Sequence, residues 1–272
     1  MDTSVMITLG FLVFAIVMFA WEKIPLSITA MVVAVGLHLS GVLSAKEAFA
    51  GFVDPNVLLF MGMFIIGEAF FATGVAVGVG NVVHKFAKTE TSLLVAVMII
   101  TGILSGFLSN TGTAAVLIPV IIGICKKSGF KQTKLLMPLV FAAAMGGNIS
   151  LIGAPGNMIA QAGLQQAGLG SFGFFDYGLV GLPILIVGTI FYATIGKRFL
   201  PDTSSHQPDG AFEGNDDYSH VPSWKKWTSA LVLILTVGAM IFEKQLGVKL
   251  YVSAWVGALV LVATNVISES AA

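Results

Sequence analysis

The chain is a succession of apolar runs, each about long enough to cross the hydrocarbon core of a lipid bilayer. The first reads MITLGFLVFAIVMFAW (6–21) and contains no charged residue. A membrane-spanning helix needs about 20 mostly apolar residues. Of the 272 residues, 56% are hydrophobic and only 10% are charged, whereas soluble domains carry about 25% charged residues. The pattern therefore predicts an all-α integral membrane protein.

Seven crossings and one re-entrant hairpin account for these runs. Six uninterrupted spans are expected at 4–21, 24–43, 56–74, 177–196, 228–243 and 250–267. Residues 91–125 are too long for one straight span, because such a helix would be about 50 Å long in a core of about 30 Å. A hairpin that enters and leaves on one side fits better. The seventh crossing, 135–167, is interrupted by GGNISLIGAPGN (146–157).

Positive charge predicts the orientation of these segments. Lysines precede and follow the hairpin, at Lys85, Lys88, Lys126, Lys127, Lys131 and Lys134. Cytoplasmic flanks carry an excess of Lys and Arg, so both ends of the hairpin are expected inside and the N-terminus outside. The polar stretch 201–226 is then a cytoplasmic linker, and NVVHKFAKTE (81–90) is a short interfacial helix.

The last two runs resemble the first two. Each pair has an apolar run that ends near aromatic-Glu-Lys, then a second run, then GVLSAKEA in one copy and NVISESAA in the other. The predicted topology inverts the second copy, an arrangement typical of secondary transporters. We expect a first repeat at 1–200, the linker, and the first two spans of an incomplete second repeat at 227–272. The predicted fold is one half of an inverted-repeat transporter.

Several classes of function are disfavoured. The formal net charge of zero argues against a basic surface for nucleic acid, and the single cysteine, Cys125, excludes an internal disulfide and a Cys-rich metal site. The sequence has no His-Glu-x-x-His motif, no Gly-x-Ser-x-Gly motif and no pair of intramembrane aspartates. We therefore expect a protein that is not an enzyme.

Two polar interruptions carry the remaining signal. SNTGT (109–113) and GGNISLIGAPGN lie inside apolar segments and share Gly, Asn, Ser, Thr or Pro. At membrane depth, irregular backbone is tolerated only where it is buried in protein or lines a wet cavity. Freed carbonyls and hydroxyls suit a sodium ion, whereas half-helix N-termini favour an anion. Small residues also allow close helix packing, which is the alternative interpretation.

The segments SGFLSNTGTAAVLIPV (105–120) and MGGNISLIGAPGNMIA (145–160) resemble the first half of the divalent-anion/sodium symporter family, within the wider ion-transporter superfamily. The resemblance implies two inverted repeats, each with a re-entrant hairpin and a broken helix. It also implies a homodimer in the lipid bilayer that carries dicarboxylates, citrate or sulfate by an elevator-type movement. Sodium is the implied coupling ion, and no cofactor is implied.

Site residues follow from the same resemblance. The substrate-binding positions are Ser109, Asn110, Thr111, Ala154 and Pro155. The sodium positions are Ser105, Ser109, Asn110 and Gly153. Asn148 and Asn157 are expected to line the unwound segment. Glu68, a carboxylate inside a predicted span, is a candidate for proton coupling by default or a side chain that reaches the interface.

Two alternatives to an anion symporter remain. A sodium/proton antiporter or an arsenite-type pump shares the superfamily's layout, but titratable groups near the two interruptions would be expected and none is there. The family builds its site from both repeats, and this sequence contains one hairpin. A truncated membrane protein that does not transport by itself is therefore the second alternative.

Overall fold

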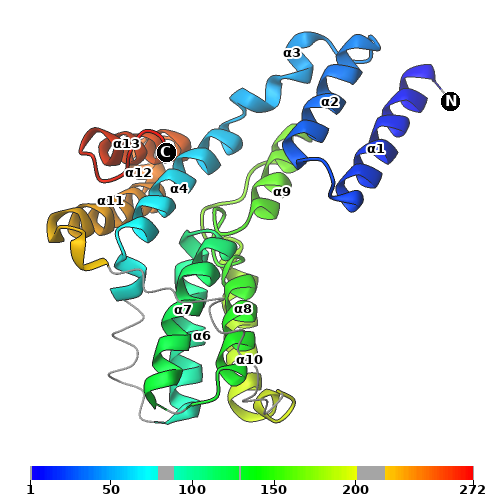
Figure 1. The fold of residues 1–272 in the computed structure, drawn as a ribbon. Helices are drawn as coiled ribbons and strands as arrows, with labels where there is room; N and C mark the ends of the chain where they lie inside the picture. The colour runs from blue at the N-terminus through cyan, green and yellow to red at the C-terminus, as the bar shows by residue number, and fades with distance from the viewer. Residues whose placement is uncertain (1, 79–88, 129, 201–217, 272) are drawn as a thin grey trace. The chain divides into compact units, whose positions relative to one another are not determined.

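The computed structural model describes residues 2–78, 89–128, 130–200 and 218–271, and within these ranges the regular elements are helices without a strand (Figure 1). The predicted all-α class is confirmed. Most of the expected interfacial helix at 81–90 and of the linker at 201–226 lies outside the described residues.

Among the described residues, four helices are long and apolar enough to cross a membrane: α1 (Thr3–Trp21), α4 (Pro55–Ala72), α6 (Glu90–Phe107) and α11 (Ser223–Ile241). The shorter apolar helices are α2 (Leu26–Leu39), α7 (Asn110–Ser128), α8 (Thr133–Gly146), α10 (Gly178–Thr194) and α13 (Leu250–Ala263). The remaining helices are α3 (Ala45–Ala48), α9 (Pro155–Gln166), α12 (Glu243–Leu246), η1 (Ala50–Val53), η2 (Gly196–Arg198) and η3 (Tyr218–His220). The predicted spans correspond to these helices with ends shifted by a few residues.

The chain divides into two compact units, residues 1–58 and 59–272. In the first unit α1 and α2 pack together, and the ring of Phe11 covers Gly36, where a side chain would leave no room for it. Helix α2 ends four residues before the predicted end of its span. Gly41 adopts a positive φ of 75°, a left-handed conformation that ends helices readily at glycine.

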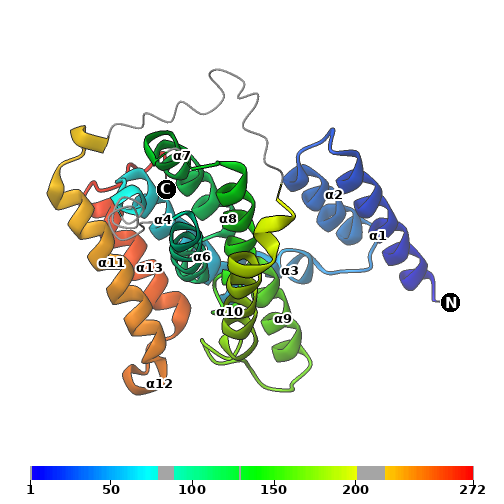
Figure 2. The same cartoon turned by 90° about the horizontal axis from the view of Figure 1, so that it is seen from below.

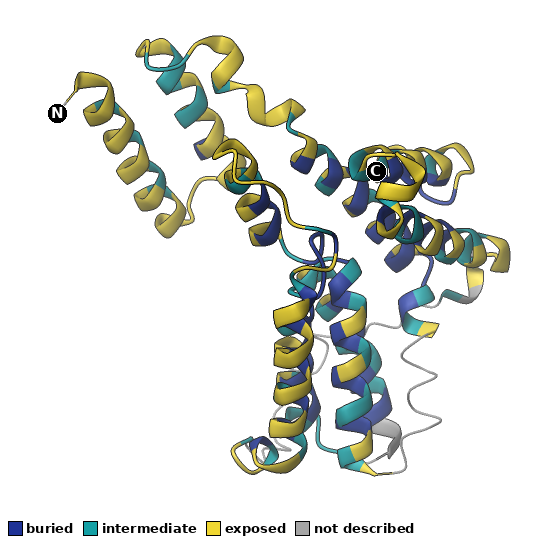
Figure 3. Cartoon of the chain, turned by 180° about the vertical axis from the view of Figure 1, so that it is seen from behind, coloured by how far each residue is buried: buried dark blue, intermediate teal, exposed yellow. Residues whose placement is uncertain are grey.

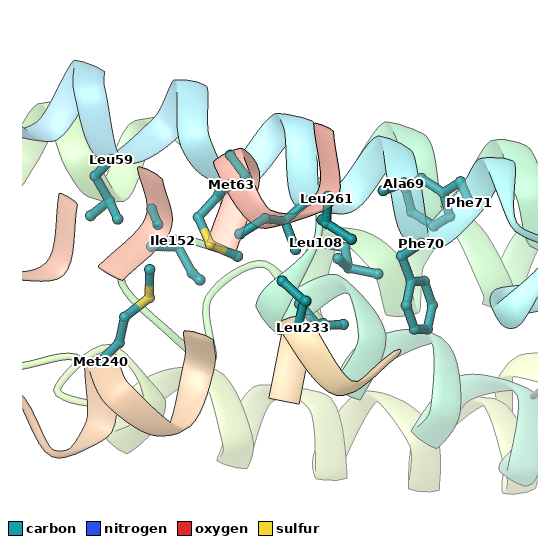
Figure 4. Close-up of a cluster of buried hydrophobic side chains, with 14 of the residues drawn as sticks. Leu59, Met63, Ala69, Phe70, Phe71, Leu108, Ile152, Leu233, Met240 and Leu261 are labelled. Atoms are coloured by element: carbon teal, nitrogen blue, oxygen red, sulfur yellow. The ribbon is translucent and has the colours of Figure 1, made fainter. Parts of the chain in front are cut away.

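In the second unit one cluster of buried apolar side chains joins α4 to α11 and α13 (Figure 4). Gly62 of α4 lies against Ala254 of α13, and Gly257 of α13 lies against Ile66 of α4. These small residues let the helices approach closely, as is common in membrane helix packing. Leu108, directly before the first polar interruption, and Ile152, within the second, belong to the same cluster.

Helices α6, α7, α8 and α10 lie together (Figure 2), and a second cluster of buried apolar side chains joins them. Helices α6 and α8 approach at two glycines: a Cβ built on Gly146 would lie 2.7 Å from the backbone carbon of Gly102. Away from the clusters, large apolar side chains are exposed, for example Leu179 and Val187 on α10 (Figure 3). Exposed apolar faces of this extent suit helices that contact lipid.

The two sequence copies have matching helices. Helices α1 and α11 each have 19 residues, and α2 and α13 each have 14. The ends of the second helices also match. The amides of Val42 and Leu43 donate to the carbonyl of Leu37.

In the second copy the amides of Val266 and Ile267 donate to the carbonyl of Leu261 in the same way. Asn265 has a positive φ of 53° at the position that corresponds to Gly41. The two second helices thus have equal length and end with the same hydrogen-bond pattern; the internal repeat stays a prediction.

Candidate functional site

The first interruption is the tight turn between α6 and α7, which Leu108 and Ser109 form. The side chain of Leu108 is buried and its backbone is extended, so α6 stops there. The hydroxyl of Ser109 accepts a hydrogen bond from the Gly112 amide at 3.0 Å, and its carbonyl accepts one from Thr113 at 2.9 Å. Ser109 is therefore the N-cap of α7, a role that serine fills well.

The second interruption is the non-helical segment 147–154 between α8 and α9, in line with the predicted break in 135–167. Its backbone is held by buried polar groups. The side-chain nitrogen of Asn157, Nδ2, donates to the carbonyls of Gly147 and Ser150, at 2.9 Å each. The Ser150 hydroxyl donates to the carbonyl of Gly106 at the end of α6. These bonds satisfy carbonyls that the interruption frees from helical pairing.

Asn157 leads to a stability prediction. In Asn157→Asp a carboxylate replaces the buried donor and faces two carbonyl oxygens, so we expect a loss of about 3–5 kcal/mol, the range for an uncompensated buried charge. Asn148→Asp is the matched control, because Asn148 is half-exposed and makes one longer bond, 3.3 Å to the carbonyl of Ala144. Thermal unfolding of the purified variants in detergent measures both. Equal losses for the two variants would contradict this role of Asn157.

The two interruptions meet at the side chain of Asn110, the first residue of α7. Ser105 Oγ donates to the Ala143 carbonyl at 2.7 Å and lies 2.6 Å from Asn110 Oδ1. The atom of the Asn110 side-chain amide that lies beside Ser105 Oγ is also 3.1 Å from the carbonyl oxygens of Gly153 and Ala143. When this atom is the amide nitrogen, it donates to these carbonyl oxygens. When it is the oxygen, four oxygens gather at one half-buried point, and the nitrogen orientation satisfies the hydrogen bonds better.

Two glycines make this approach possible. A Cβ on Gly147 would lie 2.7 Å from Asn110 Nδ2, and a Cβ on Gly153 would lie 2.6 Å from the Gly147 carbonyl oxygen. Both distances are below any normal contact. At Gly153 the neighbour is backbone, so glycine is required there, whereas a Cβ on Gly147 would push the Asn110 amide out of its place.

The ends of four helices meet around Asn110. Helices α6 and α8 end here, at Phe107 and Gly146, while α7 begins at Asn110 and α9 at Pro155. Helix C-termini carry partial negative charge and N-termini partial positive charge. The site thus offers carbonyls for a cation beside amide ends for an anion, at neighbouring positions.

The structure brings only some of the residues predicted from the sequence together at one point. Ser105, Asn110 and Gly153 come together, whereas the Ser109 hydroxyl accepts the Gly112 amide. The remaining predicted residues of the two interruptions surround this point: Thr111 and Pro155 are exposed, Ala154 and Asn148 are half-exposed, and Asn157 is buried.

Glu68 is exposed on α4, one residue from Gly67, which packs beside Leu108. The sequence analysis missed the carbonyl of Ala143. A backbone oxygen of an alanine leaves no signal in a sequence.

Comparison with known proteins decides the class. A protein family described as citrate transporter matches residues 16–272. The chain belongs to the citrate transporter family. This membership confirms the predicted resemblance and the class of membrane transporter, and the family and its relatives are transporters and not enzymes. With its several apolar helices, the chain is a multi-pass membrane protein.

Relatives of this citrate transporter family member are much longer than the chain. The chain is 34% identical to the uncharacterized transporter YfbS of Escherichia coli, over 77% of the chain and 35% of the relative. It is 28% identical to the sodium-dependent dicarboxylate transporter SdcS of Staphylococcus saprophyticus, over 66% of the chain and 37% of the relative.

It is also 26% identical to the sodium/sulfate cotransporter 1 of Chlamydomonas reinhardtii, over 74% of the chain and 24% of the relative. The chain thus spans about a third of the length of these relatives or less.

Proposed function

We propose that the chain forms the first half of a secondary active transporter that moves a small divalent or trivalent anion, such as a dicarboxylate, citrate or sulfate, together with sodium. The observation that carries the proposal is the convergence of Ser105 Oγ and the carbonyls of Ala143 and Gly153 on the Asn110 side chain, beside two helix N-termini. The printed names of the relatives, a sodium-dependent dicarboxylate transporter and a sodium/sulfate cotransporter, support the same substrate class.

Sodium is assigned to the oxygen cluster. When Asn110 turns its Oδ1 toward Ser105 Oγ and the carbonyls of Gly153 and Ala143, four neutral oxygens face one another. In the opposite orientation the amide nitrogen donates to these oxygens, so sodium binding uses the first orientation. The Ser105 hydroxyl has one proton to donate, so the remaining oxygens repel each other unless a cation lies between them. Hard cations prefer oxygen ligands, and unwound carbonyls with helix C-termini coordinate sodium in broken-helix transporters.

The anion is assigned to the N-terminal ends of α7 and α9. Ser109 and Thr111 lie at the start of α7, and Ala154 and Pro155 at the start of α9. Thr111 and Pro155 are exposed and Ala154 is half-exposed, so this surface is accessible to a solute. Helix N-termini bind carboxylate and sulfate through free amides and the helix dipole.

A sodium beside the anion lowers the cost of bringing either charge to membrane depth, which gives a physical basis for coupling. The proposal extends to a homodimer, which the family resemblance implies. It also places the N-terminus outside and the 201–226 linker in the cytoplasm, as the charge pattern predicts.

Uptake into proteoliposomes tests the proposal, with the whole transporter polypeptide that contains this chain. Radiolabelled succinate, citrate and sulfate are offered in turn under an inward sodium gradient and under an inward potassium gradient. We expect accumulation of at least one anion with sodium only. Equal uptake under both gradients would contradict sodium coupling, and no uptake of any of the three anions would contradict the substrate class.

The chemistry of the site also predicts its pH dependence. The described groups that face the Asn110 side-chain amide at this point are the Ser105 hydroxyl and backbone carbonyls, and none of them titrates near neutrality. We expect added sodium to raise the unfolding temperature of the purified chain in detergent. This rise should be constant between about pH 6 and pH 8, the range in which histidine and perturbed acids titrate. A rise that weakens steadily as the pH falls would instead support proton competition, as in a sodium/proton antiporter.

A further inference from the structure

A pocket of about 310 Å³ lies among α6, α8 and the short helix η2, away from the Asn110 site. Its lining consists of Glu90, Thr91, Leu94, Lys134, Lys197, Arg198 and Leu200. The volume is at the lower end of the range for small-molecule sites, about 300–1,000 Å³. Three of its lining side chains are cations from two separate segments, so the fold and not a local run of the sequence assembles the charge.

The polar groups in the pocket are arranged for an anion with hydroxyl groups. Lys197 Nζ is 3.3 Å from Thr91 Oγ1 and donates to it, which places this ammonium group beside the first turn of α6. One carboxylate oxygen of Glu90, Oε1, is buried and makes no hydrogen bond in the described structure. Phosphate oxygens accept charge-assisted hydrogen bonds from ammonium and guanidinium groups, and a hydroxyl donor pairs with a carboxylate oxygen.

The lining of the pocket also has an apolar part. Leu94 and Leu200 line the same pocket as the cations. The pocket also lies where apolar helices meet their charged flanks: α6 begins at Glu90, α8 at Thr133, and η2 follows the end of α10. In a membrane protein this boundary is the level of the lipid head groups.

We propose that this pocket binds the head group of an anionic glycerophospholipid, with the phosphate on Lys134, Lys197 and Arg198 and a head-group hydroxyl on Glu90. Phosphatidylglycerol has this chemistry: one phosphate charge, two free hydroxyls and acyl chains that leave along the apolar wall. The assignment is independent of transport, because it concerns a different end of the helices from the Asn110 site.

The experiment measures thermal unfolding of the purified full chain in detergent, with added phosphatidylglycerol, phosphatidylcholine or inorganic phosphate. We expect phosphatidylglycerol to raise the unfolding temperature at concentrations at least tenfold lower than phosphatidylcholine does. Arg198→Gln should remove this preference, since Arg198 is exposed and its replacement leaves the core intact. Lys244→Gln, an exposed cation on α12, is the matched control and should retain it.

Native mass spectrometry of the same samples provides a readout that does not depend on stability. Phosphatidylglycerol should remain bound to the wild-type chain and to Lys244→Gln, and be lost from Arg198→Gln. Equal effects of the two lipids, or an unchanged preference in Arg198→Gln, would overturn the proposal. Stabilisation by inorganic phosphate without a preference for phosphatidylglycerol would overturn the assignment to a lipid.

Discussion

Replacing Gly146 by alanine is expected to lower the unfolding temperature of the chain by roughly 6–12 °C, for a loss of about 3 kcal/mol. The new methyl group would meet the backbone of Gly102 on α6, 2.7 Å from its carbonyl carbon and 2.5 Å from its Cα. Backbone cannot move aside as a flexible side chain can. The two helices must therefore separate, which opens the cluster that joins α6, α7, α8 and α10.

Gly163→Ala is the matched control for Gly146→Ala. Gly163 also lies in a helix, α9, but a Cβ there has no other atom within 4 Å. Alanine favours helix by up to about 1 kcal/mol over glycine, so this variant should be as stable as the wild type or more stable. If thermal unfolding shows equal stability for the two variants, α6 and α8 do not pack at Gly102 and Gly146 as described.

Asn110→Ala should weaken sodium binding by about 10- to 100-fold. The change removes one oxygen ligand and leaves Ser105 and two carbonyls facing an empty space. A hydrogen bond to a charged group contributes about 1.5–3 kcal/mol, and we take a neutral oxygen ligand to contribute a similar amount. In proteoliposomes with the whole transporter, the effect appears as a higher sodium concentration for half-maximal uptake of the anion.

Asn148→Ala is the control for this effect, because Asn148 has the same side chain but bonds the Ala144 carbonyl of the preceding helix, α8, at 3.3 Å. Its half-maximal sodium concentration should change less than about threefold, or roughly 0.6 kcal/mol. Membrane insertion of both variants is checked by their yield in the membrane fraction. A normal sodium dependence in Asn110→Ala would remove Asn110 from the cation site.

Much of the fold follows from composition, because burial in lipid imposes long apolar helices whatever their partners. The break near 146–157 was predictable because glycine and proline interrupt helical pairing wherever they cluster. The ends of the helices were less predictable. The span expected at 24–43 ends at Leu39, since Gly41 turns the chain back onto Leu37.

The site was predictable only in its side chains. Ser105 and Asn110 are five residues apart across a predicted turn, and the resemblance pointed to both. The carbonyl of Ala143 comes from another helix, and no side chain marks it. The cap formed by Ser109 illustrates a second limit: a serine hydroxyl suits a cation and a helix N-terminus equally well, so its partner depends on the turn that forms.

Equilibrium binding of radioactive sodium to the purified full chain tests the central claim most directly. The chain is held in detergent, and bound ²²Na⁺ is displaced by unlabelled sodium or by potassium. If the oxygens of Ser105, Asn110, Ala143 and Gly153 form a cation site, binding is saturable and sodium displaces it at lower concentrations than potassium does. Binding that does not saturate, or equal displacement by the two ions, would contradict a sodium site where the two interruptions meet.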